Sequence, residues 1–437
     1  MSRLTELRER IDSREARIGV VGLGYVGLPL ALEFAKAGFR VTGFELDAEK
    51  VRVLNEGGSY ILDVPAAEVR AERDAGRLEA TTDFAALSTT DVVNVCVPTP
   101  LKKTKDPDVS HIVQAVEEIR KRLRSGQLVI LGSTTYPGTT HELFVPMLEE
   151  AGLQVGSDFS VAFAPERIDP GNKDFAVRQV PKVVGGETPL CGELATAVYE
   201  TIFDQVVLVS SSQSAEMVKL LENTFRAINI GLANEVALMC DKLDLDVWEV
   251  IDAAATKPYG FMKFQPGPGL GGHCIPVDPT YLAWKMKSLN FSARFIELAT
   301  EINGHMPEYV VQSIGDVLNE ERLAVNGARV LILGVAYKPD ISDMRESPAL
   351  DIIRLLQARG AEVRYHDPHV PELDLEGVSA KSVELTNDEL QACDLAVVIT
   401  AHAAVDYDRV VAQAPRVYDT RNATRQVAEG REKVRKL

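Results

Sequence analysis

Ile18-Gly-Val-Val-Gly-Leu-Gly-Tyr-Val-Gly27 is the stretch of the chain that says most about its architecture. Gly22, Gly24 and Gly27 have the spacing G-x-G-x-x-G, directly after an apolar segment typical of a buried strand. Helical residues 28–37 follow, and a second strand-like run, 40–44, comes next. A strand, a glycine turn, a helix and a strand in this order are what a dinucleotide-binding βαβ unit requires.

The three glycines have different expected roles. Gly22 allows the tight turn, Gly24 leaves room for a pyrophosphate to approach the backbone, and Gly27 lets the helix pack closely on the strand. The N-terminus of the helix would stabilise the phosphate charge. Tyr25 and Val26 lie in the same turn, and we expect them to contact the cofactor.

An acidic residue after the second strand predicts which dinucleotide binds. Glu45 follows residues 40–44, where a carboxylate accepts hydrogen bonds from the adenosine ribose hydroxyls and repels a 2′-phosphate. The sequence therefore favours NAD over NADP. Asp47 is the alternative acid, and Lys50 would lie on the adenosine side.

The rest of the chain predicts an α/β fold with an N-terminal Rossmann-type parallel sheet, a central long helix and a C-terminal second α/β domain. Short apolar runs alternate with amphipathic stretches before residue 212, which indicates a parallel sheet covered by helices. Residues 215–242 form a long helical pattern without proline. We predict domains at 1–212 for NAD, 213–315 for the central helices and 316–437 for the second α/β unit, which ends in a frayed basic tail.

Composition excludes several classes of function. The 437 residues carry 47 Lys and Arg against 64 Asp and Glu, a net charge of −17, which argues against binding to nucleic acid or to an anionic membrane surface. No apolar run is long enough for a transmembrane helix, and the charged N-terminus is unlike a signal peptide. The 5 scattered cysteines favour a reducing compartment, so we expect a cytoplasmic protein.

Residues 266–279, PGPGLGGHCIPVDP, are too rich in glycine and proline for a helix or strand and predict a shaped loop. This loop carries Cys274. A cysteine there is a covalent nucleophile if its thiolate is stabilised, and otherwise a small buried residue. Asp278 follows four residues later.

Six motifs in one order give a family resemblance. After the glycine turn come residues 133–139, STTYPGT; 164–167, APER; Lys219-x-x-x-Asn223; 271–274, GGHC, with Asp278; and Lys338 with 345–347, RES. Together they resemble the UDP-sugar 6-dehydrogenase family, from about residue 18 to 421. Residues 165–172, 254–261 and 266–285 most resemble the UDP-N-acetyl-D-glucosamine 6-dehydrogenases of surface-polysaccharide pathways. UDP-N-acetyl-D-mannosamine and UDP-glucose dehydrogenases are the alternatives.

The resemblance implies a four-electron oxidation of C6 of the sugar with two NAD. Cys274 would add to the aldehyde, giving a thiohemiacetal and then a thioester. Lys219 and Asn223, four apart on one helix face, would stabilise charge on the C6 oxygen, and Asp278 would accept a proton. Without the resemblance, a surface lysine and a mid-helix asparagine are the commoner interpretation.

Other roles implied by the resemblance involve residues that follow strands. Thr134 would hold a water near C6, and Glu166 would activate the water that hydrolyses the thioester. Many UDP-glucose enzymes carry a second carboxylate four residues after the first, where this chain has Pro170, and no role passes to Asp169.

The remaining expected contacts divide between cofactor and substrate. Thr99, Ser133 and Arg345 would contact the cofactor. The residues expected to contact the UDP-sugar, besides Glu166, Lys219 and Asn223, are Arg167, Gly271, His273, Tyr337, Lys338 and Arg421.

The sequence predicts no metal, because the 7 histidines have no zinc-ligand spacing and 366–369 reads as a turn. The long central helix needs a partner, and the resemblance implies a homodimer or a dimer of dimers. Two rival functions stay open. A single-step β-hydroxyacid dehydrogenase needs neither Cys274 nor the C-terminal domain at 316–437. A non-catalytic nucleotide-sugar sensor would be free to lose the thiol.

Overall fold

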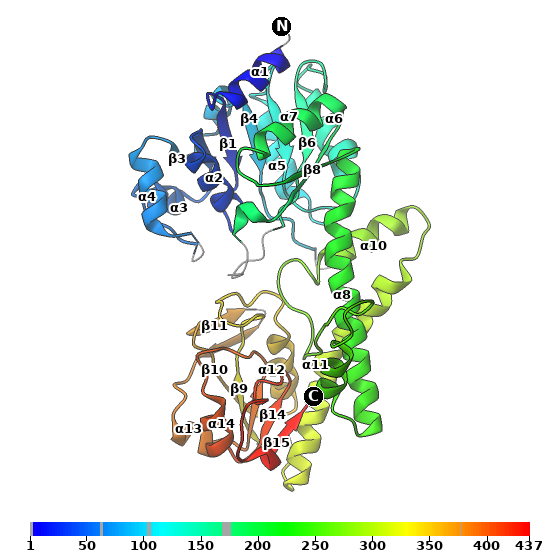
Figure 1. Cartoon of the computed structure of the whole chain (residues 1–437). Helices are drawn as coiled ribbons and strands as arrows, with labels where there is room; N and C mark the ends of the chain where they lie inside the picture. The colour runs from blue at the N-terminus through cyan, green and yellow to red at the C-terminus, as the bar shows by residue number, and fades with distance from the viewer. Residues whose placement is uncertain (1–2, 62–63, 103–105, 168–175, 376) are drawn as a thin grey trace. The chain divides into compact units, whose positions relative to one another are not determined.

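The computed structural model describes residues 3–61, 64–102, 106–167, 176–375 and 377–437 (Figure 1). The chain divides into two compact units. The first unit is Met1–Glu222 with Thr280–Asn290, and the second is Asn223–Pro279 with Phe291–Leu437. Each is described by itself.

The first unit is built on an eight-stranded sheet in the order β3-β2-β1-β4-β5-β6-β7-β8. All neighbours are parallel except β6 and β7, which pair antiparallel. The strands are β1 (Arg17–Val21), β2 (Arg40–Phe44), β3 (Leu78–Thr81), β4 (Val92–Val95), β5 (Leu128–Leu131), β6 (Ser160–Phe163), β7 (Lys182–Gly186) and β8 (Val206–Val209).

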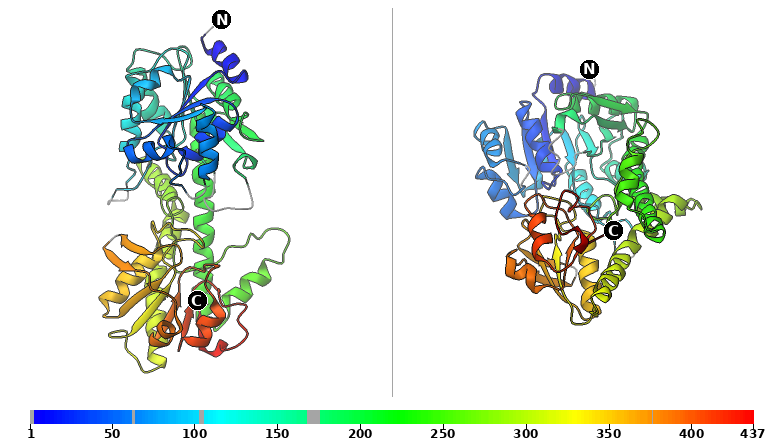
Figure 2. Two further views of the ribbon diagram at one scale, coloured as in Figure 1. Left: turned by 90° about the vertical axis from the view of Figure 1, so that its left-hand side faces the viewer. Right: turned by 60° about the horizontal axis from the view of Figure 1, so that its bottom comes forward.

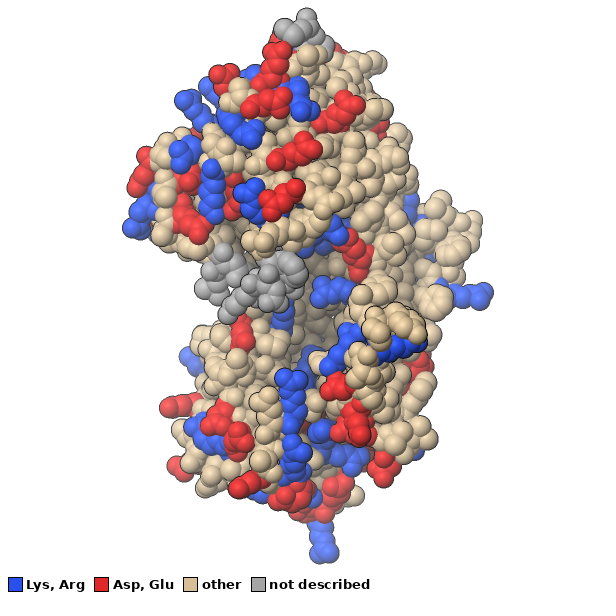
Figure 3. Space-filling view, viewed as in Figure 1, with Lys and Arg blue, Asp and Glu red and all other residues tan. Residues whose placement is uncertain are grey.

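Helices cover both faces of this sheet (Figure 2). One apolar core lies between the sheet and α1 (Arg3–Asp12), α2 (Gly27–Lys36) and α7 (Pro189–Tyr199). The other lies between the opposite face and α5 (Ser110–Arg120) and α6 (Val145–Glu149). The short helices α3 (Ala48–Asn55) and α4 (Ala66–Asp74) flank β3. On the face shown in Figure 3, acidic and basic side chains of this unit are interspersed.

The second unit contains a five-stranded parallel sheet in the order β10-β9-β13-β14-β15 and a small β11–β12 pair. Buried apolar side chains form a core on each face of the five-stranded sheet. The strands are β9 (Arg329–Leu333), β10 (Glu362–His366), β11 (Glu372–Leu375), β12 (Val378–Lys381), β13 (Leu395–Val398), β14 (Val417–Asp419) and β15 (Val434–Lys436); the covering helices are α11 (Arg294–Glu320), α12 (Pro348–Ala358), α13 (Asn387–Ala392) and α14 (Tyr407–Gln413).

The central helices match the long apolar pattern of the sequence. Helix α8 (Ser212–Leu243) begins in the first unit and continues into the second, where α9 (Val247–Ala254) packs on its C-terminal half. Helix α10 (Asp278–Ser288) follows the cysteine loop. No helix in the described part of the chain combines the length and the apolar character needed to cross a bilayer. The predicted α/β fold class is confirmed, and the predicted domain boundaries stay a prediction.

The C-terminal tail corrects one expectation. Residues 431–437 are not frayed, because Val434–Lys436 forms β15 and pairs with β14. Arg435 contacts Asp241 at 3.5 Å, and Lys436 contacts Asp246 at 2.8 Å. Without this strand, β14 would leave its backbone groups unpaired at the sheet edge.

Candidate functional site

The glycine turn of the first unit has the shape that a dinucleotide phosphate needs. Gly22 has φ +88°, and a Cβ on Gly27 would lie 1.8 Å from the Gly22 carbonyl oxygen, so both positions require glycine. A Cβ on Gly24 would meet nothing within 4 Å. Gly24 therefore faces open space at the start of α2, where the helix N-terminus favours an anion. These residues fit the pyrophosphate of NAD.

Glu45 follows β2 beside this turn. Its carboxylate accepts hydrogen bonds from the backbone N–H groups of Leu23 at 3.1 Å and Leu46 at 2.9 Å. The carboxylate is thus held next to the turn, and its role as acceptor for the ribose hydroxyls stays a prediction. Tyr25 is exposed in the turn, and Val26 occupies the N-cap position of α2.

Tyr60 is a neighbour of the turn that the sequence analysis did not find. Its hydroxyl donates to the Leu23 carbonyl at 2.7 Å, and the Lys50 ammonium lies 5.5 Å from its ring centroid. Burial, together with the charges of Glu45 and Asp47, raises the pKa of Tyr60. The hydroxyl therefore stays protonated and holds the turn.

Polar residues follow the ends of β4 and β5. Thr99 is buried, and its carbonyl accepts a hydrogen bond from the Tyr281 hydroxyl. Ser133 is buried and donates to the Val97 carbonyl at 2.8 Å. Thr134, the next residue, is half-buried. In a parallel sheet these strand ends share one edge, which is where ligands bind.

Glu166 follows β6 and meets a buried lysine that the sequence analysis missed. Its Oε1 accepts from the Arg167 N–H at 2.7 Å, and its Oε2 lies 3.2 Å from Nζ of Lys182 in β7. Lys182 is 2% exposed, and its ammonium lies over the rings of Tyr199 and Phe203. Lys182 therefore helps to fix the position of Glu166. Asp169 and Pro170 lie outside the described residues.

Two residues of α8 bind the loops beside the first sheet. Glu222 forms an ion pair with Arg167 at 2.6 Å. Glu216 accepts from the Gly138 N–H at 2.5 Å and from the Thr140 N–H at 2.8 Å, which anchors the loop after β5. Burial raises the pKa of Glu216 to about 7, against the opposing effect of these hydrogen bonds.

Lys219 lies on α8 one turn before Asn223. Lys219 is 9% exposed, and no described carboxylate forms an ion pair with it. A buried ammonium is costly to desolvate unless an acceptor compensates it. Lys219 is thus suited to an oxygen of a ligand.

In the second unit, Cys274 is exposed at the end of the glycine-rich loop. Its carbonyl accepts the Asp278 N–H at 2.8 Å, so the loop closes into the first turn of α10. The Asn223 amide donates to the Asp278 carboxylate at 2.5 Å, and both side chains are buried. The structure therefore brings Asn223 and Asp278 together, and the backbone links Asp278 to Cys274.

Close packing explains why the loop before Cys274 contains two adjacent glycines. A Cβ on Gly271 would lie 2.6 Å from Cβ of Tyr337. A Cβ on Gly272, which has φ +91°, would lie 2.7 Å from the ring of Tyr337. The Gly272 N–H donates to the Arg345 carbonyl at 3.0 Å. Tyr337 and Arg345 thus shape the cysteine loop. The Arg345 guanidinium pairs with Asp343 at 2.7 Å.

His273 is half-buried beside this contact. Burial lowers the pKa of His273, and the nearby Arg345 charge lowers it further, against the effect of Asp343. The imidazole is therefore neutral at pH 7. A neutral ring suits the expected role of shaping a sugar pocket better than a role as a cation.

Arg421 packs against the start of the same loop. A Cβ on Gly267 would lie 2.3 Å from Nη1 of Arg421, and Nε of Arg421 donates to the Ile399 carbonyl at 2.9 Å. Burial lowers the pKa of Arg421 to about 10, with Asp419 opposing. Its guanidinium has no ion pair among the described residues, so it is available to an anion. Lys338 is half-buried in the loop after β9.

A buried amide network, also missed from the sequence, holds Gly267. Its N–H donates to Asn234 at 2.8 Å, and the Asn234 amide donates to Asn303 at 2.8 Å. Asn234 lies on α8 and Asn303 on α11, so both helices anchor the loop that ends in Cys274.

One family of known proteins matches most of the chain. The UDP-glucose/GDP-mannose dehydrogenase family matches through its NAD binding domain at residues 16–203, its central domain at 213–305 and its UDP binding domain at 331–426.

Individual relatives differ in the sugar they are named for. A UDP-N-acetyl-D-glucosamine 6-dehydrogenase of Pseudomonas aeruginosa is 40% identical, covering 83% of this chain and 85% of that protein. A UDP-N-acetyl-D-mannosamine dehydrogenase of Campylobacter jejuni is 34% identical, covering 90% of this chain and 98% of that protein. The solved structure of a UDP-D-ManNAc dehydrogenase from Pyrococcus horikoshii has a TM-score of 0.88 at 32% identity, covering 96% and 98%.

Proposed function

The chain belongs to the UDP-glucose/GDP-mannose dehydrogenase family and is an NAD-dependent UDP-sugar dehydrogenase; on this premise, we propose that it oxidises UDP-N-acetyl-D-glucosamine to UDP-N-acetyl-D-glucosaminuronic acid for surface-polysaccharide synthesis. The choice of UDP-N-acetyl-D-glucosamine as substrate is supported by the 40% identity to the Pseudomonas aeruginosa enzyme. The chemistry rests chiefly on one observation: Cys274 is exposed on a loop that is closed onto the buried Asn223–Asp278 pair.

The overall change converts a primary alcohol, two NAD and water into a carboxylate, two NADH and three protons. NAD supplies the acceptor for one hydride in each of the two oxidations. The first oxidation turns the C6 alcohol into an aldehyde. Lys219 and Asn223 would stabilise the charge on the C6 oxygen, and Asp278 would accept the proton.

Cys274 makes the second oxidation feasible. An aldehyde carbon has no tetrahedral C–H that can leave as hydride until a nucleophile adds. The Cys274 sulfur would add to C6 and form a thiohemiacetal, and loss of the second hydride would give a thioester. Water then breaks the C–S bond, releases the thiol and leaves the carboxylate. A single-step dehydrogenase would need no such thiol.

Glu166 and Thr134 would handle the water of the last step. The Lys182 ammonium and the Arg167 N–H hold the Glu166 carboxylate in one position. A fixed carboxylate would orient a water and accept its proton, and the Thr134 hydroxyl would hold that water near C6.

The UDP group would bind the second unit. The Arg421 guanidinium lies against Gly267 without an ion pair among the described residues, as a diphosphate contact requires. Lys338 and Tyr337, in the loop after β9, would contact the substrate beside the cysteine loop.

The oligomer and the compartment also belong to this proposal. Large apolar side chains are exposed along α8, among them Leu221, Phe225 and Leu232. A second copy of the chain would cover them, giving a homodimer or a dimer of dimers. The 5 scattered cysteines favour a reducing compartment, which supports a cytoplasmic location.

UDP-N-acetyl-D-mannosamine is the second candidate substrate, because relatives and a solved structure named for that activity match most of the chain. Parallel assays of kcat/KM with UDP-N-acetylglucosamine, UDP-N-acetylmannosamine and UDP-glucose test the choice. We expect turnover of UDP-N-acetylglucosamine at least roughly tenfold above the others, since one good polar contact is worth about a factor of ten. Preference for another sugar would overturn the substrate and leave the mechanism intact.

Cys274→Ala tests the mechanism, with Cys240→Ala as its matched control because Cys240 is a buried cysteine on α8, outside the cysteine loop. Cys274→Ala is expected to bind UDP-sugar and form no uronic acid. A variant that still makes uronic acid at the parent rate would contradict the thioester route. Binding without turnover in the parent protein itself would support the sensor instead.

A further inference from the structure

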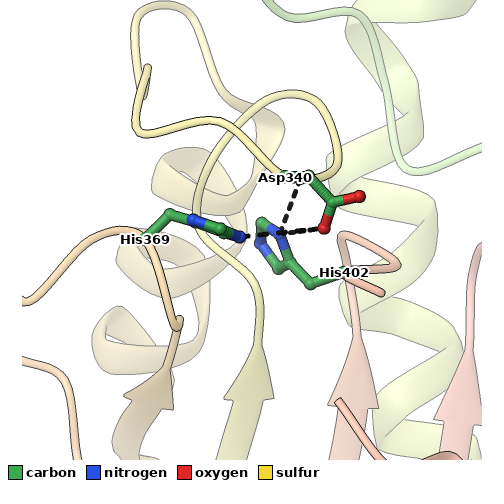
Figure 4. Close-up of side chains that lie close together, drawn as sticks. All are labelled: Asp340, His369 and His402. Carbon is green, nitrogen blue, oxygen red and sulfur yellow. Dashed lines mark hydrogen bonds and ion pairs between the residues drawn. The ribbon is translucent and has the colours of Figure 1, made fainter. Parts of the chain in front are cut away.

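Three side chains of the second unit converge at the carboxyl end of its sheet. Asp340 follows β9, His369 follows β10 and His402 follows β13, and these three strands are neighbours. One ligand atom from each lies within 4.8 Å of the other two. Figure 4 shows the side chains pointing toward one another, with an Asp340 oxygen 3.7 Å from Nε2 of His369 and 3.8 Å from Nδ1 of His402.

A buried carboxylate fixes the orientation and tautomer of His402. Both His402 and Asp367 are 0% exposed, and Nε2 of His402 donates to Asp367 at 3.0 Å. Nδ1 accepts the N–H of Asp340 at 3.0 Å, so it carries the lone pair. Asp367 is itself held by the N–H groups of Val335 and His369 at 2.8 Å. A histidine whose other nitrogen donates to a carboxylate is the usual arrangement of a metal ligand.

His369 supplies the second observation. Its Nε2 is buried and has no hydrogen-bond partner among the described residues, although it points at Asp340 and His402. A buried imidazole nitrogen without a partner is unfavourable in a protein interior. An ion between the three side chains would satisfy it.

We propose that Asp340, His369 and His402 bind one divalent transition-metal ion of the zinc class. Two imidazoles and one carboxylate are a donor set that suits zinc and disfavours magnesium and calcium, which prefer oxygen ligands alone. Three protein ligands leave a fourth position for water. This site is separate from the residues assigned to the dehydrogenase reaction, and it does not depend on the choice of sugar.

Ion binding requires a small rearrangement. Ligand atoms on one zinc ion lie roughly 3.3 Å apart, somewhat closer than the separations here. The ion also replaces the N–H of Asp340 as the partner of Nδ1 of His402. Asp340 has φ +62° in the loop after β9. The metal would therefore tie this loop, which also carries Lys338, to the ends of β10 and β13.

Titration of the tag-free, EDTA-treated full chain with ZnCl2 by calorimetry tests the proposal. We expect one tight ion per chain and a higher unfolding temperature with zinc, but no such shift with MgCl2. Asp340→Asn and His369→Gln each remove one ligand and should weaken zinc binding roughly tenfold or more. His305→Gln is the matched control, because His305 is an exposed histidine beside Glu308 on α11.

Cobalt distinguishes this site from the exposed Cys274 thiol. Co2+ bound to nitrogen and oxygen ligands gives visible d–d bands without a thiolate charge-transfer band. The proposal is overturned if His369→Gln and Asp340→Asn bind zinc as tightly as the parent, if cobalt shows thiolate ligation only, or if no ion binds. Zinc affinity that falls in both variants and is kept in His305→Gln supports it.

Discussion

Lys182→Met is expected to destabilise the first unit strongly, because Lys182 begins β7 with its side chain buried. Its ammonium is 3.2 Å from the Glu166 carboxylate, and the two side chains are 2% and 10% exposed. Removing one partner of a buried ion pair costs roughly 3–5 kcal/mol, because the other charge stays desolvated. The Tyr199 and Phe203 rings, 5.0 and 5.4 Å away, add about 1 kcal/mol.

We expect Lys182→Met to lower the free energy of unfolding by about 3 kcal/mol. This is near the lower end of the range because the Arg167 N–H still donates to the Glu166 carboxylate. Glu166→Gln combined with Lys182→Met removes both charges and should recover at least about 1 kcal/mol of that loss. Lys36→Met is the control, since Lys36 pairs with Glu33 on the surface and should lose under about 1 kcal/mol.

Urea unfolding measured in a Trp248→Phe background makes this assay specific. The chain has 2 tryptophans, and Trp284 then reports on the first unit alone. If Lys182→Met lowers the free energy of unfolding by less than about 1 kcal/mol, the stabilising role of the buried ion pair is refuted. So would a double variant whose loss equals the sum of the two single losses, because the charges would then be uncoupled.

Two further predictions concern the glycine turn and the thiols. Gly24→Val should keep the thermal stability of the protein, because its Cβ enters open space. The same side chain would occupy the space expected for the pyrophosphate, so NAD binding in calorimetry should weaken at least roughly tenfold. Gly27→Ala should unfold the turn, because its Cβ would lie 1.8 Å from a backbone oxygen. Burial raises the pKa of Cys96 and of Cys393 to about 12, so both thiols stay protonated at neutral pH and iodoacetamide should modify the exposed Cys274 first. Mass spectrometry that finds Cys96 modified as fast as Cys274 near pH 8 would contradict this, since a protonated thiol is a poor nucleophile.

Local signals in the sequence predicted the cofactor end and the cysteine loop. The G-x-G-x-x-G spacing depends on backbone approach within six residues, and the structure shows the predicted open position at Gly24. The run before Cys274 has two adjacent glycines because a side chain there would collide with Tyr337. In both cases the glycines stand close together in the sequence, so the sequence alone shows the motif, although the partner of Gly271 and Gly272 is the distant Tyr337.

Strands β3, β7 and β15 were not predicted because their short segments lack a continuous apolar run. Strand β7 ends in two glycines that resemble a turn, and β15 is Val-Arg-Lys at the end of the chain. Their place in a sheet comes from pairing with β2, β6, β8 and β14, which are distant in sequence.

Lys182 and the histidine cluster were missed for a related reason. A lysine in a sequence normally indicates a solvated surface, and only the fold places Lys182 against Glu166 and two rings. Asp340, His369 and His402 have no ligand spacing along the chain. The strand order β10-β9-β13 brings them together.

The NADH yield per sugar consumed tests the four-electron route through Cys274 most directly. The parent enzyme, with limiting UDP-N-acetylglucosamine and excess NAD, should form two NADH for each molecule of uronic acid. One NADH per sugar, with the aldehyde as product, would contradict the role assigned to Cys274 and make the enzyme a single-step dehydrogenase.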